Sequence, residues 1–374
     1  ILDETQTAMG GRMLKRWMVL PLKNKAPIER RLSVVSFLKE HQELSFELSQ
    51  RLKNIGDLER LISKVAVGKV NPREVAHLKR TLTEIPSIKT LLQKKSNPKG
   101  LTEMLNKLDS CEKLVALIDK TLAEEPAGQF GKGEVIHSGW NKELDELREI
   151  AYHGKDFLAE MQKRESERTG IPSLKIAFNN VFGYYIEVRN AHKDKVPEEW
   201  IRKQTLVNAE RYITEELKVY EQKILGAEEK ILVLEQRLFQ ELILEMAAYI
   251  LPIQTNAQIL GRIDCLLSFA TVAEKHNYCK PSINEGTKLK ISKGRHPVIE
   301  QAMPLGEPYV ANDLMLDPES QQMMMITGPN MSGKSALLRQ TALIVLMAQM
   351  GCFVPAESAE IGVVDKVFTT SGAK

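Results

Sequence analysis

The chain has 374 residues, of which 43% are hydrophobic and 27% charged, a balance typical of a folded protein with two or three domains. Its net charge of +3 is too small to argue for a nucleic-acid partner by itself, so any basic surface must be local. The sequence predicts a cytosolic protein with reduced thiols, because no apolar run reaches a membrane span, no signal peptide is present, and the four cysteines lie far apart.

Residues 1–125 have the apolar spacing of successive helices. One helix is expected to begin at Pro72, with Asn71 as its cap. Residues 125–139 are rich in glycine and predict a loop. The chain starts inside a predicted helix and stops just after a predicted strand, so we expect a fragment of a longer protein.

A long helix is predicted from about Asn208 to Tyr249, on the order of 60 Å in length. Residues 141–165 carry a matching apolar stripe, with Gly154 as a gap in it, and predict an antiparallel partner helix. The long helix has apolar or small residues at alternating steps of four and three, which is a heptad seam. The seam residues are Ile213, Leu217, Tyr220, Ile224, Ala227, Ile231, Leu234 and Leu238.

Between these helices, residues 174–188 alternate apolar and polar side chains around Asn179 and Asn180, which predicts a β-hairpin. The chain is therefore expected to run out along one helix, form a β-rich tip at about residues 166–208, and return along the other. Tyr184 and Tyr185 are interpreted as sheet packing rather than base stacking.

The stretch from Gly328 to Ser335 fits the phosphate-loop pattern G-x-x-x-x-G-K-[ST]. An apolar stretch at residues 323–327, predicted to be a strand, precedes it, and an apolar helix is predicted to follow. In such a loop, backbone N–H groups and the helix N-terminus surround an anion. Lys334 is then expected to reach the outer phosphates, and the Ser335 hydroxyl to ligate Mg²⁺.

An ATPase also needs an acidic residue at the end of a neighbouring strand. The candidate here is Asp365, but the strand is expected to continue beyond it through residues 366–370. Asp365 is therefore interpreted as a surface residue, and efficient hydrolysis of ATP is not expected from this chain.

Long stretches of the sequence resemble the MutS family of bacterial DNA mismatch-recognition proteins. Residues 326–357, 294–300 and 307–314 are similar to the family's ATPase domain. Residues 2–22 resemble the start of its helical core, and residues 181–188 and 202–221 resemble its clamp and returning lever helix. The resemblance implies a mainly α protein with α/β parts: a helical core at 1–140, an outgoing lever helix at 141–165, a β-rich clamp tip at 166–208, a returning lever helix and core at 209–285, and a truncated ABC-type P-loop ATPase domain at 286–374.

The resemblance further implies a homodimer that encircles mismatched double-stranded DNA, binds ATP with Mg²⁺, works with a downstream factor of the MutL type, and is cytoplasmic and nucleoid-associated. It implies that Tyr309 stacks on adenine and that Val310 backs it. Ala336 stands where many members have Thr, and Val207 replaces a more usual Lys. The implied ATP-binding residues are Gly328, Pro329, Asn330, Met331, Ser332, Gly333, Lys334, Ser335, Ala336, Tyr309 and Val310, with Ser335 on the metal.

The tip carries basic residues that the resemblance places on DNA backbone, although the residues alone equally fit a mixed solvated surface. His296 is interpreted as structural. Two alternatives remain: a MutS paralogue that acts in recombination, and a coiled-coil ATPase that tethers DNA, in which the phosphate loop precedes the coil. A scaffold with a vestigial phosphate loop is disfavoured by intact Lys334 and Ser335. The candidate DNA-binding residues are Arg202, Lys203, Asn208, Lys193 and Lys195, with Arg211 nearby.

Overall fold

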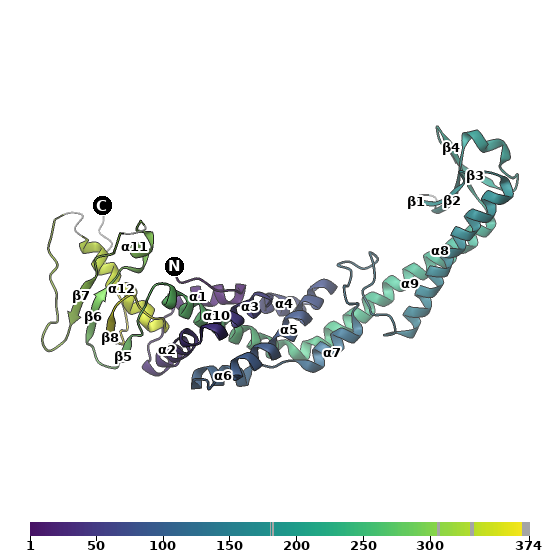
Figure 1. Cartoon of the computed structure of the whole chain (residues 1–374). Coiled ribbons are helices and arrows are strands. Elements are labelled where there is room, and N and C mark those ends of the chain that lie inside the picture. Colours follow the sequence, from purple (N-terminus) through teal and green to yellow (C-terminus); the bar gives the residue numbers. More distant parts are fainter. Residues whose placement is uncertain (180, 182, 305–306, 330–332, 369–374) are drawn as a thin grey trace. The chain divides into compact units, whose positions relative to one another are not determined.

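A computed structural model describes residues 1–374 except 180, 182, 305–306, 330–332 and 369–374. The chain forms two compact units (Figure 1). The first comprises Ile1–Lys69, His77–Val115 and Ala247–Lys374, and the second comprises Val70–Ala76 and Ala116–Met246. Among the described residues, no helix has both the length and the apolarity needed to cross a membrane.

The first unit has a helical part built around α10, which spans Ile250–Lys275. This helix is apolar on nearly all sides and is therefore enclosed by other helices. It also buries Asp264, whose carboxylate accepts hydrogen bonds from the backbone N–H groups of Gln6 and Thr7 and from the Thr7 hydroxyl. The other helices of this unit are α1 (Ala8–Val19), α2 (Lys25–Glu40), α3 (Gln42–Lys53), α4 (Leu58–Ala66) and α6 (Lys99–Lys107), with the short η2 (Ala247–Tyr249) before α10. Most of α5 (Pro72–Gln93) belongs to the first unit, and most of α7 (Glu112–Thr121) to the second.

The predicted start of α5 is confirmed. The Asn71 side chain accepts a hydrogen bond from the backbone N–H of Glu74 at 2.9 Å, and the Glu74 carboxylate accepts one from the backbone N–H of Asn71 at 3.1 Å. This reciprocal pair is a capping box, and it satisfies donors that the first turn of a helix leaves free.

The first unit also contains a four-stranded sheet with two helices beside it. The strand order is β5-β8-β6-β7, with β5 and β8 parallel and the other pairs antiparallel. The elements are β5 (Ser282–Asn284), β6 (Leu289–Gly294), α11 (Pro297–Ala302), β7 (Asn312–Leu316), α12 (Lys334–Met350) and β8 (Ser358–Gly362).

Two strand predictions in this sheet region are wrong. Residues 323–327 pair with none of the described strands, and Met323 and Met325 are 83% and 85% exposed. An apolar run becomes a strand only when a neighbour accepts its backbone hydrogen bonds, and here no described neighbour does. The strand expected through residues 366–370 ends earlier, at Gly362, as far as the described residues reach.

The second unit pairs two long helices, α8 (Lys142–Thr169) and α9 (Glu215–Met246), which lie side by side in Figure 1. The predicted seam is buried or half-buried along α9 from Leu217 to Leu238. Gly154 of α8 faces Ile224 of α9 so closely that a Cβ at position 154 would lie 2.4 Å from the Ile224 Cγ1 atom. Glycine is therefore needed where the two helices approach.

A four-stranded antiparallel sheet lies at the end of this helix pair, in the order β1-β2-β4-β3. The predicted hairpin is present, although Asn180 of its predicted turn lies outside the described residues. Trp200 and Tyr212 pack with Leu158 and Leu217 in the core between the sheet and the helices. The elements are β1 (Lys175–Asn179), β2 (Gly183–Arg189), η1 (Asn190–Lys195), β3 (Ile201–Thr205) and β4 (Ala209–Ile213).

The returning helix begins later than predicted. Residues Ala209–Ile213 form β4, which pairs with both β2 and β3, and α9 starts only at Glu215. Ile213, the first residue of the predicted seam, therefore belongs to the sheet. Its spacing from Leu217 fits a helix, but the backbone hydrogen bonds to β2 and β3 decide the local structure.

Candidate functional site

The phosphate loop leads directly into α12. Gly333 caps this helix in the left-handed region, with φ of 89°, a conformation that glycine adopts without steric cost. Lys334 is the first residue of the helix, and its ammonium donates to the backbone carbonyls of Gly328 and Pro329, the latter at 3.0 Å. A cation and the N-terminus of a 17-residue helix therefore lie together at the loop. The predicted residues Asn330, Met331 and Ser332 lie outside the described residues.

A cleft of about 820 Å³ joins the loop to the segment before β7. Tyr309 and Val310 line it from one side, and the loop and the first turn of α12 line it from the other. The cleft thus brings together residues that lie about 20 positions apart in the sequence. The predicted ATP-binding residues that line it are Gly328, Pro329, Gly333, Lys334, Ala336, Tyr309 and Val310.

Ser335, the predicted metal ligand and the second residue of α12, does not line this cleft and is exposed. Asp365, interpreted from the sequence as a surface residue, is exposed in the segment that follows β8. No Asp or Glu is among the described residues that line the cleft, so the acidic residue that hydrolysis needs is not among them.

Tyr309 is held at its hydroxyl end. The hydroxyl donates a hydrogen bond to the Gln340 side-chain oxygen at 2.9 Å, and burial raises the pKa of the Tyr309 phenol, which favours the protonated donor form. Gln340 projects from α12 and is only 1% exposed. Sequence reasoning did not single out Gln340. The available signal was a polar residue on an otherwise apolar stretch of helix.

His296 is a structural residue. Its Nδ1 atom accepts hydrogen bonds from the backbone N–H groups of Val298 and Ile299, both at 3.3 Å, and so caps α11. Burial lowers the pKa of His296, which favours the neutral form that this cap requires. Since Ile299 lines the cleft, this cap fixes one of its apolar walls.

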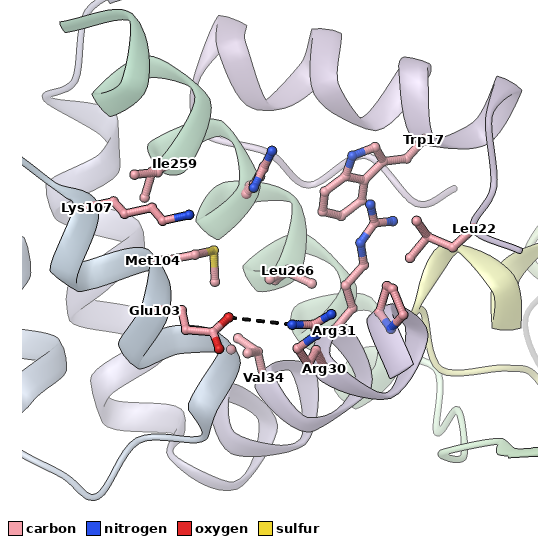
Figure 2. A pocket seen from close by; sticks show the side chains of 13 residues that line it. Trp17, Leu22, Arg30, Arg31, Val34, Glu103, Met104, Lys107, Ile259 and Leu266 are labelled. Carbon is pink, nitrogen blue, oxygen red and sulfur yellow. Dashed lines mark ion pairs between the residues drawn. The ribbon is translucent and has the colours of Figure 1, made fainter. Parts of the chain in front are cut away.

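A second hollow, of about 350 Å³, lies among α1, α2, α6 and α10 (Figure 2). Two of its basic side chains, Arg30 and Arg31, contact other residues of the protein. The Arg31 guanidinium lies 3.4 Å above the centre of the Trp17 ring and donates to the Met350 carbonyl, and Arg30 is 3.7 Å from Glu103. None of the residues predicted to bind ATP lines this hollow, so the nucleotide assignment rests on the cleft beside α12.

The predicted DNA-binding residues are all exposed on the sheet of the second unit or beside it. Arg202 is 3.4 Å from Glu210 and is partly neutralised by it. Lys203 is the extra residue of a β-bulge in β3, since Arg202 pairs with Tyr212 and Gln204 with Arg211. The other predicted residues are Lys193 and Lys195 on η1 and Asn208 before β4.

Arg211, predicted to lie near this surface, interacts with other residues of the sheet. Its guanidinium contacts Glu187 at 3.1 Å and Gln204 at 2.9 Å, and it lies 4.2 Å from the centre of the Tyr185 ring. Tyr185 itself is buried, which supports its interpretation as a packing residue.

Comparisons with known proteins identify relatives of the whole chain. The family model described as MutS domain III matches residues 1–270, and the one described as MutS domain V matches residues 324–374. The chain is 60% identical to the DNA mismatch repair protein MutS of Parabacteroides distasonis over 373 residues, 58% identical to that of Bacteroides fragilis, and 57% identical to that of Flavobacterium psychrophilum. Each match covers 100% of this chain and 43% of the relative, so the chain spans less than half of the length of these relatives.

Proposed function

Because this chain belongs to the MutS family, we propose that it forms the helical body, the DNA-contacting sheet and a nucleotide-binding lobe of a DNA mismatch repair protein. The observation that carries the proposal is the cleft in which Tyr309 and Val310 face the phosphate loop. This cleft has an aromatic wall and a cationic floor, which suits a purine base joined to phosphates.

The residues that line the cleft fit the base and phosphates of ATP, and Ser335, exposed on the first turn of α12, supplies the hydroxyl proposed for Mg²⁺. The triphosphate would lie on Gly328, Gly333 and the N-terminus of α12, where backbone N–H groups and Lys334 face it. Mg²⁺ would neutralise phosphate charge, with the Ser335 hydroxyl as its protein ligand. Tyr309 would stack on adenine, beside Val310. We expect binding without efficient turnover, because no carboxylate is among the described residues of the cleft.

The exposed residues of the second sheet are proposed to contact duplex DNA through its phosphates. Lys193, Lys195, Arg202 and Lys203 supply positive charge, and Asn208 supplies a hydrogen-bonding side chain. Such contacts position a duplex without reading its bases. In the longer protein the proposed partners are mismatched DNA, a second copy of the protein and a factor of the MutL type, on the nucleoid.

The two alternatives are not favoured. The phosphate loop follows the helix pair, whereas a DNA-tethering coiled-coil ATPase has it first. The relatives that match the whole chain are named as DNA mismatch repair proteins, which favours mismatch repair over recombination.

The test is equilibrium binding of ATP·Mg²⁺ to this chain and to its Lys334→Ala variant, followed by a turnover assay on the same samples. We expect binding by the unsubstituted chain, at least about tenfold weaker binding by the variant because the cation on the phosphates is removed, and negligible turnover. Equal binding by both chains, with the variant folded by circular dichroism, would refute a phosphate-loop site.

A further inference from the structure

The hydrogen bond between Tyr309 and Gln340 connects one wall of the cleft to the helix α12. Tyr309 lies on the segment before β7, whereas Gln340 lies six residues after Lys334 on the same helix. Six residues of α-helix rise about 9 Å, so α12 spans the distance between a phosphate-binding end and the aromatic wall. The helix α12 therefore connects the phosphate-binding loop at its N-terminus to Tyr309, which is held by Gln340.

Gly294 makes room for this contact. A Cβ at position 294 would lie 2.7 Å from the Gln340 amide nitrogen and 2.8 Å from a methyl group of Ile291. Gly294 ends β6, where it pairs with Asn312 of β7. Position 294 thus requires glycine for space, and any larger residue displaces the Gln340 side chain.

We propose that Gln340 is a positioning residue that fixes the ring of Tyr309 as the base-stacking wall of the nucleotide site. This inference rests on the proposed function. A tyrosine whose hydroxyl is held by a hydrogen bond loses less freedom when a base stacks on it, so this hydrogen bond increases affinity for the base. The hydroxyl contact also makes Tyr309 differ from phenylalanine, which presents the same ring without the anchor.

Loss of the Tyr309–Gln340 hydrogen bond should weaken binding of the adenine base and leave binding of the phosphates unchanged. We would measure the affinities of ATP·Mg²⁺ and of tripolyphosphate·Mg²⁺, which lacks the base, for the full chain and for Tyr309→Phe, Gln340→Met and the double variant. A second readout is the fluorescence of 2-aminopurine riboside triphosphate, which falls when the base stacks on an aromatic ring.

We expect each single variant to bind ATP about 3- to 10-fold more weakly, the range expected for one hydrogen bond, with a smaller fluorescence decrease. The double variant should match the single variants, because both remove the same hydrogen bond. Tripolyphosphate affinity should stay within about twofold in all chains. Gly294→Ala should reproduce the loss of ATP affinity, because it displaces Gln340 without changing either partner.

Unchanged ATP affinity in Tyr309→Phe would overturn the proposal, and so would additive losses in the double variant. A parallel loss of tripolyphosphate affinity would show that Gln340 only supports the lobe. If Gln340→Met does not fold, Tyr309→Phe alone tests the proposal. It removes the same hydrogen bond by changing Tyr309, which is only partly buried. Failure of the proposed function is distinct, because then the unsubstituted chain binds neither ligand in a Lys334-dependent way.

Discussion

Gln349, one residue before the end of α12, and Leu22, three residues after the end of α1, exchange two hydrogen bonds. The backbone N–H of Leu22 donates to the Gln349 carbonyl at 3.0 Å, and the Gln349 side-chain amide donates to the Leu22 carbonyl at 2.8 Å. The same side chain also pairs with the backbone of Val364 in both directions. The helix that begins at the phosphate loop is thus anchored at its far end to the helical part of the first unit.

Replacing Gln349 should weaken the attachment of the end of α12 to Leu22 and Val364. Gln349→Ala removes side-chain partners from partly buried backbone groups of Leu22 and Val364, and we expect a loss of about 1–3 kcal/mol in the free energy of unfolding. The measurement is chemical denaturation followed by the fluorescence of buried Trp17 in a chain whose other tryptophans are replaced by phenylalanine. Gln236→Ala, at an exposed position of α9, is the matched control. Equal midpoints for the two variants would contradict the account.

The helix pair gives an internally controlled packing test. In Gly154→Ala, the new Cβ meets Ile224 at 2.4 Å, so the helices must separate, and we expect a loss of about 1–3 kcal/mol in stability. In Gly226→Ala, on the facing helix, nothing lies within 4 Å of the new Cβ, and the higher helix propensity should stabilise α9 by about 0.5–1 kcal/mol. Thermal unfolding of both variants measures the difference. A shift of stability in the same direction in both variants would contradict this packing of α8 against α9.

The stability of the first unit should depend on His296 at mildly acidic pH. Burial lowers the folded-state pKa of His296, so below the ordinary value of about 6.5 the unfolded chain binds a proton that the folded chain resists. The stabilisation is complete above about pH 6.5 and declines as the pH falls towards the folded-state pKa. His296→Asn keeps a cap acceptor without titrating, so its unfolding midpoint should change less between pH 7 and 5. A His296→Asn variant that keeps the full pH dependence of the unsubstituted chain would contradict this prediction.

Charge reversal on the exposed sheet should weaken binding of duplex DNA. Arg202→Glu and Lys203→Glu each remove a proposed interaction with a phosphate, so the dependence of log K on log salt should flatten by about one unit for each substitution. Lys230→Glu, on an exposed part of α9, makes the same change in net charge and is the control. Titrations of a labelled duplex at several salt concentrations give the slopes. An unchanged slope in both sheet variants would rule out these interactions with phosphates.

Local patterns predicted the elements whose structure is decided locally. The 4,3 spacing from Leu217 to Leu238 predicted α9, and Asn71 followed by Pro72 predicted the start of α5. The same spacing misplaced Ile213, because pairing with β2 and β3 is not encoded in helical periodicity. The apolar composition of residues 323–327 predicted a strand. Composition does not show whether a neighbouring strand is present to accept the backbone hydrogen bonds, and among the described strands none pairs with this stretch.

The parts of the site that belong to a sequence motif could be predicted. Contacts between side chains that are distant in the sequence could not. The glycine pattern indicated the loop and Lys334, and the family resemblance indicated Tyr309. Gln340 and its bond to Tyr309 could not be predicted, because the partners are 31 residues apart. The contacts of Arg211 with Glu187 and Gln204 could not be predicted either, because they join residues of different strands.

The central claim is that the segment around Tyr309 and the loop around Lys334 form one nucleotide site. Hydrogen–deuterium exchange with and without ATP·Mg²⁺ tests it most directly, with Lys334→Ala measured alongside. ATP should slow exchange in peptides covering residues 307–312 and 333–340 together, and Lys334→Ala should abolish both effects. Protection of only one of these segments, or protection that survives Lys334→Ala, would contradict it.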